Sequence, residues 1–96
     1  MKHPDINTVD LADIMYALSD PNRLEIVKRL SGGEVMTCGA LNGDRPKSSM
    51  SHHFKILRSA GVLETQIEGK EHLNRLRLTE LEERFPGLMA HVIKFL

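Results

Sequence analysis

Residues 47–61 place basic and hydroxyl side chains opposite an apolar stripe, on what their spacing predicts to be a single helix. At about 100° per residue, Phe54 and Leu57 lie within about 40° of Met50 and would face a core. The opposite side is polar and carries Ser48, His52, Lys55 and Ser59. Positions 45–63 contain no acidic residue. Ordinary solvated faces usually include carboxylates, so this face favours a polyanionic partner.

The composition describes one globular domain without net charge. The chain has 96 residues, of which 41% are apolar and 27% charged, and no apolar run approaches the length of about 20 residues needed to cross a bilayer. The N-terminus lacks an apolar secretory segment, and a lone Cys38 cannot form an intrachain disulfide, which favours the cytoplasm. Thirteen basic and thirteen acidic side chains cancel, so nucleic-acid binding would depend on local charge.

Two helices are predicted before the helix-turn-helix unit. Asp20 and Pro21 are typical of a helix start, because the carboxylate can accept from free N–H groups and proline at the first position loses no hydrogen bond. Gly32 and Gly33 end this second helix. The first helix, over residues 8–18, is predicted from apolar residues at helical spacing, which are Leu11, Ile14, Met15 and Leu18.

The middle of the chain predicts a helix-turn-helix unit over residues 37–60. A brief extended segment precedes Thr37, whose hydroxyl can cap a short helix through Leu41. Residues 42–46 have the composition of a turn and lead into the polar-faced helix. This turn is longer than is usual between the helices of such a unit.

A β-hairpin is predicted over residues 62–78. Residues 62–68 and 72–78 look extended, and Gly69-Lys70 between them suits a tight turn. Because a two-stranded hairpin is only marginally stable alone, it must pack on the helices.

The C-terminal part predicts a helix and a surface for a second subunit. Thr79 and Glu82 have the spacing of a capping box, and Pro86-Gly87 interrupts the helix that follows. Residues 88–96 are more apolar than a core of this size needs. We therefore predict a dimer interface between the helices of residues 8–18 and 80–96, formed by Leu11, Ile14, Met15, Leu18, Leu88, Val92, Phe95 and Leu96.

Two segments resemble one bacterial family. Residues 17–27, ALSDPNRLEIV, resemble the ALSDPTRLxIL opening of ArsR-type repressors, and residues 51–63, SHHFKILRSAGVL, resemble their SxHLKxLRxAGLV recognition segment. Gly69-Lys70 and the alternation after it are similar to their wing. The resemblance covers about residues 8–96. It implies a mostly α winged helix-turn-helix fold, ordered α-α-α-α-β-β-α and dimeric through its terminal helices. The implied function is that of a homodimeric repressor bound to a pseudo-palindromic operator on double-stranded DNA.

The early turns of the second helix of such a unit enter the major groove, which displays distinguishable base edges. Lys55 and Arg58, further along, are predicted to contact phosphates. His53 lies about 60° from Met50 and is predicted to face the core and bond to backbone. The alternative for the whole face is solvation, with Ser48 or Ser49 capping the helix. The candidate base-contacting residues are Lys47, Ser48, Ser49, Ser51 and His52.

The hairpin offers a second DNA contact. Lys70 stands at its tip and is a candidate phosphate ligand, although Glu68 and Glu71 flank it. His72, Arg75 and Arg77 lie nearby and could extend the footprint. The alternative is that these charges are simply solvated.

Cofactors and catalysis are not predicted. Soft-metal sites of the family use a Cys-x-Cys pair, whereas Met36 stands where the first thiol would be, and His91 alone does not complete the second known ligand arrangement. We predict no metal, no cofactor and no enzyme activity, with Cys38 as a small buried hydrophobe. Two alternatives stay open. One is a winged-helix module that binds a protein instead of DNA, and the other is a metal- or redox-responsive repressor that uses Cys38.

Overall fold

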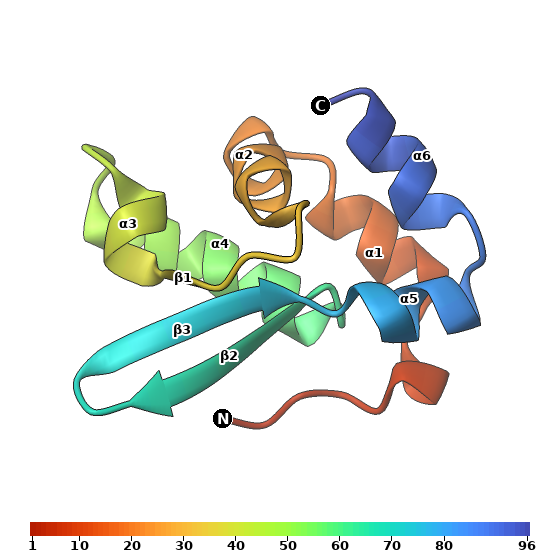
Figure 1. Cartoon of the computed structure of the whole chain (residues 1–96), viewed down its shortest axis with the longest axis horizontal. Helices are drawn as coiled ribbons and strands as arrows, with labels where there is room; N and C mark the ends of the chain where they lie inside the picture. The colour runs from red at the N-terminus through yellow and green to blue at the C-terminus, as the bar shows by residue number, and fades with distance from the viewer.

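The computed structural model describes all 96 residues as one layer of helices packed on a small sheet (Figure 1). The three strands are antiparallel in the order β1-β3-β2. A short 3₁₀ helix, η1, precedes the first α-helix. The elements are η1 (Ile6–Thr8), α1 (Leu11–Ala17), α2 (Pro21–Leu30), β1 (Met36–Thr37), α3 (Cys38–Asn42), α4 (Lys47–Ser59), β2 (Leu63–Glu68), β3 (Glu71–Leu76), α5 (Leu78–Arg84) and α6 (Leu88–Lys94).

The first helix is shorter than predicted. The sequence predicts a helix over residues 8–18, but Thr8 belongs to η1 and α1 spans only Leu11–Ala17. The Asp10 carboxylate accepts from the N–H of Ala12 at 3.3 Å, so the helix starts at this cap. The predicted range of residues 8–18 places Asp10 inside the helix, whereas in the structure Asp10 is its N-terminal boundary.

The start of α2 is confirmed. Asp20 Oδ1 accepts from the backbone N–H groups of Asn22 and Arg23, at 2.8 and 3.2 Å, and Pro21 occupies the first helical position. Partial burial by itself would raise the pKa of Asp20, but the two N–H donors together hold it below its usual value.

The predicted hairpin is present, and the brief extended segment predicted before Thr37 pairs with it as a third strand. β2 and β3 pair from Leu63 with Leu76 to Glu68 with Glu71, which leaves Gly69-Lys70 as the two-residue turn. The second strand ends at Leu76 rather than at residue 78. On its other edge β3 pairs with β1. Two residues are too few to show the alternation by which a strand is recognised in a sequence.

The capping-box prediction is wrong. α5 begins at Leu78, so Thr79 lies inside the helix, and the cap position is Arg77, whose side chain makes no capping bond. Glu82 accepts instead from the N–H of Gly87, at 3.2 and 3.1 Å. The interruption at Pro86-Gly87 is confirmed, since α6 begins directly after it. The element order thus ends in two helices rather than one.

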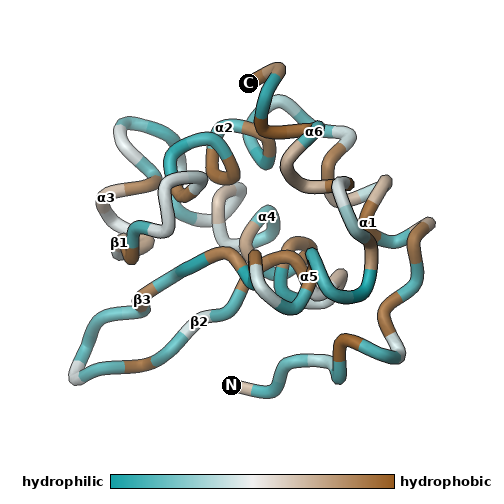
Figure 2. The backbone as a smooth tube through the Cα atoms, turned by 45° about the vertical axis from the view of Figure 1, so that its right-hand side comes forward, coloured by the Kyte–Doolittle hydropathy of each residue, from teal (hydrophilic) through white to brown (hydrophobic).

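A single core of 17 buried apolar residues joins the helices to the sheet. Met50, Phe54 and Leu57 of α4 belong to this core, which confirms the apolar stripe of that helix. Asn74 of β3 is also fully buried, where its amide accepts from Thr65 Oγ1 at 2.7 Å and donates to the Met36 carbonyl at 3.2 Å. Figure 2 shows that most of the hairpin beyond the core is hydrophilic. None of the helices has the length and hydropathy of a membrane span.

Candidate nucleic-acid interface

α3 and α4 form the helix-turn-helix unit, and an arginine orders the long turn between them. Arg45 donates to the carbonyls of Leu41 and Asn42, at 2.6 and 3.1 Å, and to Asn22 Oδ1 of α2 at 2.9 Å. Thr37 caps α3 as predicted, because its hydroxyl accepts from the N–H of Ala40 at 3.1 Å. The guanidinium of Arg45 therefore joins the turn to α3 and α2, and its hydrogen bonds are made within the chain.

The polar face of α4 is exposed to solvent. Lys47, Ser48, Ser49, Ser51, His52 and Lys55 are exposed, and Arg58 is half-buried. Ser49 and Ser51 donate to the carbonyls of Pro46 and Lys47, at 3.0 and 2.9 Å. Each hydroxyl keeps its capacity to accept a hydrogen bond from outside. The capping role proposed for Ser48 or Ser49 is wrong, because the cap position is Pro46 and both serines lie inside the helix.

His53 faces the core side of α4, as predicted, but its partner differs from the prediction. Instead of backbone, its Nδ1 lies 3.1 Å from Arg23 Nη1 and 3.8 Å from Asp20 Oδ1. Because guanidinium groups only donate, Nδ1 accepts this bond and the proton of a neutral ring is on Nε2. His53 is thus a structural residue that joins α4 to the start of α2.

Arg23, which the sequence analysis missed, is the centre of this junction. Its side chain is buried and donates to the Ala17 carbonyl at 2.7 Å and to the Tyr16 carbonyl at 3.1 Å, at the end of α1. The signal was present in the sequence, since Arg23 precedes Ile26, Val27 and Leu30 at the spacing of one helix face. A charged residue on an apolar stripe predicts a buried, paired group.

The hairpin presents less free positive charge than its sequence suggests. Arg75 donates to both carboxylate oxygens of Glu64, at 3.1 and 3.0 Å, and this hydrogen bonding lowers the pKa of Glu64. Arg77 is buried, donates to Glu80 at 3.1 and 2.7 Å and also binds the Pro4 carbonyl. The suggestion that Arg77 extends a DNA footprint is therefore wrong, whereas Arg75 remains exposed and the suggestion for it stays a prediction. Lys70 at the tip is exposed and free of such partners.

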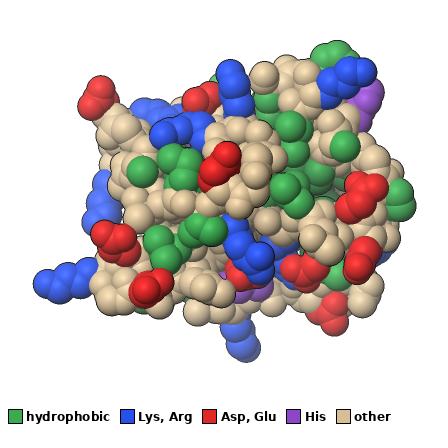
Figure 3. Space-filling view, viewed as in Figure 1, with side chains coloured by type: hydrophobic (Ala, Val, Ile, Leu, Met, Phe, Trp, Pro, Cys, Tyr) green, Lys and Arg blue, Asp and Glu red, His purple; other side chains and the backbone are tan.

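The predicted dimer face is only partly on the surface. Ile14 is fully buried and Leu18 is 9% exposed, so both pack in the core of their own chain, which corrects the prediction for these two. Leu11, Met15 and Phe95 are 44%, 48% and 72% exposed. Leu88, Val92 and Leu96 are half-buried against the core. Tyr16, which the prediction omitted, is 60% exposed. In Figure 3 hydrophobic side chains gather over the part of the surface where α1 and α6 lie in Figure 1.

Cys38 is half-buried at the start of α3. Its Sγ accepts a hydrogen bond from the Asn74 amide at 3.2 Å, so the thiol is tied to the polar pair that Asn74 forms with Thr65. No group of three or more histidine, cysteine, aspartate or glutamate side chains is arranged to hold a metal ion.

Comparison with known proteins places this geometry in a family. A family model described as a helix-turn-helix domain matches residues 18–66. The chain is 37% identical over 68 residues to an arsenical resistance operon repressor of Staphylococcus xylosus, a match covering 70% of this chain and 65% of that protein. It is 32% identical over 84 residues to the transcriptional repressor SdpR of Bacillus subtilis, covering 85% of this chain and 92% of that one.

Solved structures share the fold. HlyU from Vibrio cholerae superimposes with a TM-score of 0.73 at 21% identity, over 88% of each chain. A crystal structure of an ArsR family transcriptional regulator gives a TM-score of 0.69 at 24% identity, over 98% of this chain and 92% of that one. With the two motifs, the winged helix-turn-helix and these relatives together, the chain belongs to the ArsR-type family of DNA-binding transcriptional repressors.

Proposed function

We propose that the chain acts as a homodimeric repressor on a pseudo-palindromic operator in double-stranded DNA, and hence in the cytoplasm of a bacterial cell. The observation that carries this proposal is the exposed face of α4, which combines hydroxyl, imidazole and basic groups without a carboxylate. A two-fold dimer would present two copies of this face to two half-sites. Such a protein needs neither cofactor nor catalytic group, and we propose no enzyme activity.

The face of α4 divides along its length. Ser48, Ser49, Ser51 and His52, in the first turns, have short or planar polar side chains that can approach base edges in the major groove. Lys55, Arg58 and the wing residue Lys70 present cations suited to phosphates, which position the protein without reading sequence. The structural role of His53 supports this division, because it leaves His52 as the only imidazole of α4 directed to solvent.

The dimer interface in this proposal uses the exposed and half-buried apolar residues of α1 and α6. It keeps six of the predicted residues and adds Tyr16 in place of the two core residues. Equilibrium sedimentation at micromolar concentration should show a dimer. A monomer at that concentration would remove this interface from the proposal. The six retained residues are Leu11, Met15, Leu88, Val92, Phe95 and Leu96.

Selection of bound sequences from a random duplex pool would supply the operator and test the proposal directly. With the selected site in hand, the double variant Ser51→Ala and His52→Ala should lose preference for the operator over scrambled DNA. Lys55→Ala should weaken both duplexes equally and lower the salt dependence of log K by about one unit per protomer. Equal losses from both kinds of variant on both duplexes would refute the division of α4.

Mixed genomic DNA separates the proposal from the protein-binding alternative. A DNA-binding protein must lose affinity steeply between about 50 and 200 mM salt. Binding releases counterions from the phosphates, and this release becomes less favourable as the salt concentration rises. Absence of any binding at the lower salt concentration would favour a module that binds another protein.

A further inference from the structure

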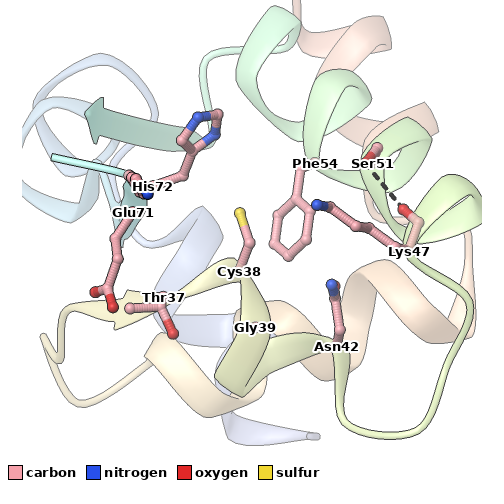
Figure 4. Close-up of a pocket in the computed structure, with 10 residues that line it drawn as sticks. Thr37, Cys38, Gly39, Asn42, Lys47, Ser51, Phe54, Glu71 and His72 are labelled. Atoms are coloured by element: carbon pink, nitrogen blue, oxygen red, sulfur yellow. Dashed lines mark hydrogen bonds between the residues drawn. The ribbon is translucent and has the colours of Figure 1, made fainter. Parts of the chain in front are cut away.

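A polar cleft of about 400 Å³ lies between the helix-turn-helix unit and the wing tip (Figure 4). Residues of α3, of the first two turns of α4 and of the wing tip line the cleft, and Cys38 and Phe54 are its two hydrophobic lining residues. Two lysines from distant parts of the chain, Lys47 and Lys70, line the same space. The cleft therefore joins the two elements that a winged helix-turn-helix protein directs towards DNA.

Lys47 extends its side chain into this cleft. Figure 4 shows the ammonium group near the Phe54 ring, on the opposite side of the ring from Cys38. No hydrogen bond or salt bridge within the chain engages this ammonium group. Ser51 donates to the carbonyl of Lys47 at 2.9 Å, which fixes the first turn from which the lysine starts.

Asn42 of α3 supplies an unused polar group in the same place. Its Oδ1 is the single buried side-chain polar atom of the molecule without a hydrogen-bond partner. The amide nitrogen points into the cleft (Figure 4) and has no acceptor in the chain. The unpaired Oδ1 only accepts hydrogen bonds and cannot bind an anion, so it is the amide nitrogen of Asn42 that can donate to an acceptor in the cleft.

We propose that the cleft seats one phosphodiester of the DNA backbone, bound by Lys47, Lys70 and Asn42. This inference rests on the proposed function. If the face of α4 enters the major groove and the wing tip reaches the adjacent minor groove, the strand between those grooves crosses the space between α4 and the wing. That space is this cleft. Lys47 is then a phosphate ligand and not a base-contacting residue, which revises its place among the sequence-based candidates.

The charges that line the cleft determine which side chains attract a phosphate and which repel it. Two ammonium groups and the imidazole of His72 face one carboxylate, that of Glu71. A phosphodiester carries one negative charge and only accepts hydrogen bonds, so it matches the lysines and the Asn42 amide and is repelled by Glu71. Removal of this carboxylate should therefore strengthen binding to any duplex.

The size of the Lys47 effect follows from counterion release. One phosphate contact contributes about 0.9 to the slope of log K against log salt, which corresponds to about fivefold in affinity at 0.15 M salt. Lys47→Gln should lose about this factor per protomer on operator and scrambled duplex alike, with the ratio between them unchanged. Glu71→Gln should raise affinity for both duplexes. Lys28→Gln, at an exposed position of α2 outside the cleft and the proposed dimer interface, is the matched control and should change neither slope nor affinity.

The experiment is a salt titration of duplex binding by fluorescence anisotropy, with sedimentation to verify that each variant keeps the wild-type oligomeric state. A specificity ratio that falls with Lys47→Gln at unchanged slope would overturn the inference and return Lys47 to base contact. Unchanged affinity would also overturn it, while wild-type binding to the operator would leave the proposed function intact. Failure of the wild type to bind any duplex at 50 mM salt would instead remove the proposed function.

A second titration uses inorganic phosphate in place of DNA, at constant ionic strength. Weak or absent binding of free phosphate supports a site that binds phosphate only as part of the DNA backbone. Tight binding of free phosphate that Lys47→Gln abolishes, together with unchanged DNA affinity, would identify the cleft as a small-anion site and overturn the assignment to the backbone.

Discussion

Replacement of Arg23 by methionine should destabilise the fold more than any change on the exposed face of α4. Methionine keeps most of the apolar stem of the side chain, so the variant removes the guanidinium and little of the packing. Three acceptors then lose their donor, which are the carbonyls of Tyr16 and Ala17 and the Nδ1 atom of His53. The end of α1 and the middle of α4 would no longer be joined through α2.

The magnitude can be worked from these contacts. A hydrogen bond to a charged group contributes about 1.5–3 kcal/mol, so three give an upper bound of about 4.5–9 kcal/mol. The Tyr16 carbonyl lies at an exposed residue, where water can replace the lost donor, whereas the Ala17 carbonyl belongs to a fully buried residue. We therefore expect a loss of about 3–5 kcal/mol. A domain of this length has a total of about 5–14 kcal/mol, so the variant removes a large share of it.

Urea denaturation followed by far-ultraviolet circular dichroism measures this loss. Wild type and variants are compared at one protomer concentration, because dimerisation adds to apparent stability. Arg23→Lys keeps the charge but cannot serve three separated acceptors, and should lose about half as much. Lys28→Met, at an exposed position of the same helix, should stay within about 0.5 kcal/mol of wild type. A loss below about 1 kcal/mol for Arg23→Met would refute the role given to this junction.

Three further predictions concern His3 in the N-terminal segment and the two glycines Gly61 and Gly69. Burial, with a smaller contribution from the charge of Arg77, lowers the pKa of His3 below 6.5, and its neutral Nε2 accepts from the N–H of Thr65 at 3.0 Å. As pH falls below 6.5, the unfolded chain therefore binds more protons at His3 than the folded chain does, and the wild type should lose stability down to the folded-state pKa. The His3→Gln variant should lose less stability over the same range. Parallel pH profiles of the two proteins in urea denaturation would contradict this prediction. Gly61→Ala should cost more than about 2 kcal/mol, because φ is 81° and a Cβ would lie 2.5 Å from the Val9 side chain. At Gly69, where φ is 62° and the space is open, asparagine should cost less than about 1 kcal/mol in the same urea denaturation assay.

The sequence predicts the structure correctly wherever the structure depends on neighbouring residues alone. Asp20 with Pro21 predicts the start of α2, Gly69-Lys70 predicts the hairpin turn, and the spacing of Met50, Phe54 and Leu57 predicts the buried stripe of α4. Each signal depends on residues within one or two turns of each other, and the structure follows it. The family resemblance then ordered these elements into a winged helix-turn-helix.

Prediction failed where a distant residue overrides the local rule. Thr79 and Glu82 have the spacing of a cap, but Arg77 pairs with Glu80 and with the Pro4 carbonyl, and α5 starts before the threonine. Ile14 looked like an interface residue because its neighbours on α1 are apolar, yet α1 buries one side in its own core. The sequence of a short amphipathic helix does not distinguish apolar residues that face the core from those that face a partner.

The wing shows why net charge is a poor guide to the partner of this chain. Six of the seven arginines donate hydrogen bonds to other groups of the chain, and Arg58 is the exception. No lysine does so, and none is in a salt bridge. Arginine suits these internal roles because its planar group serves several acceptors at once, whereas lysine carries a compact, hydrated charge.

The two arginines Arg75 and Arg77 pair with Glu64 and Glu80, so the positive charge around α4 comes from lysines and Arg58. The formal charge of zero is a sum over the whole chain, whereas the exposed face of α4 carries basic groups and no carboxylate. Only cations that contact phosphates release counterions, so the salt slope should follow the cations of α4 and the wing tip and not the net charge.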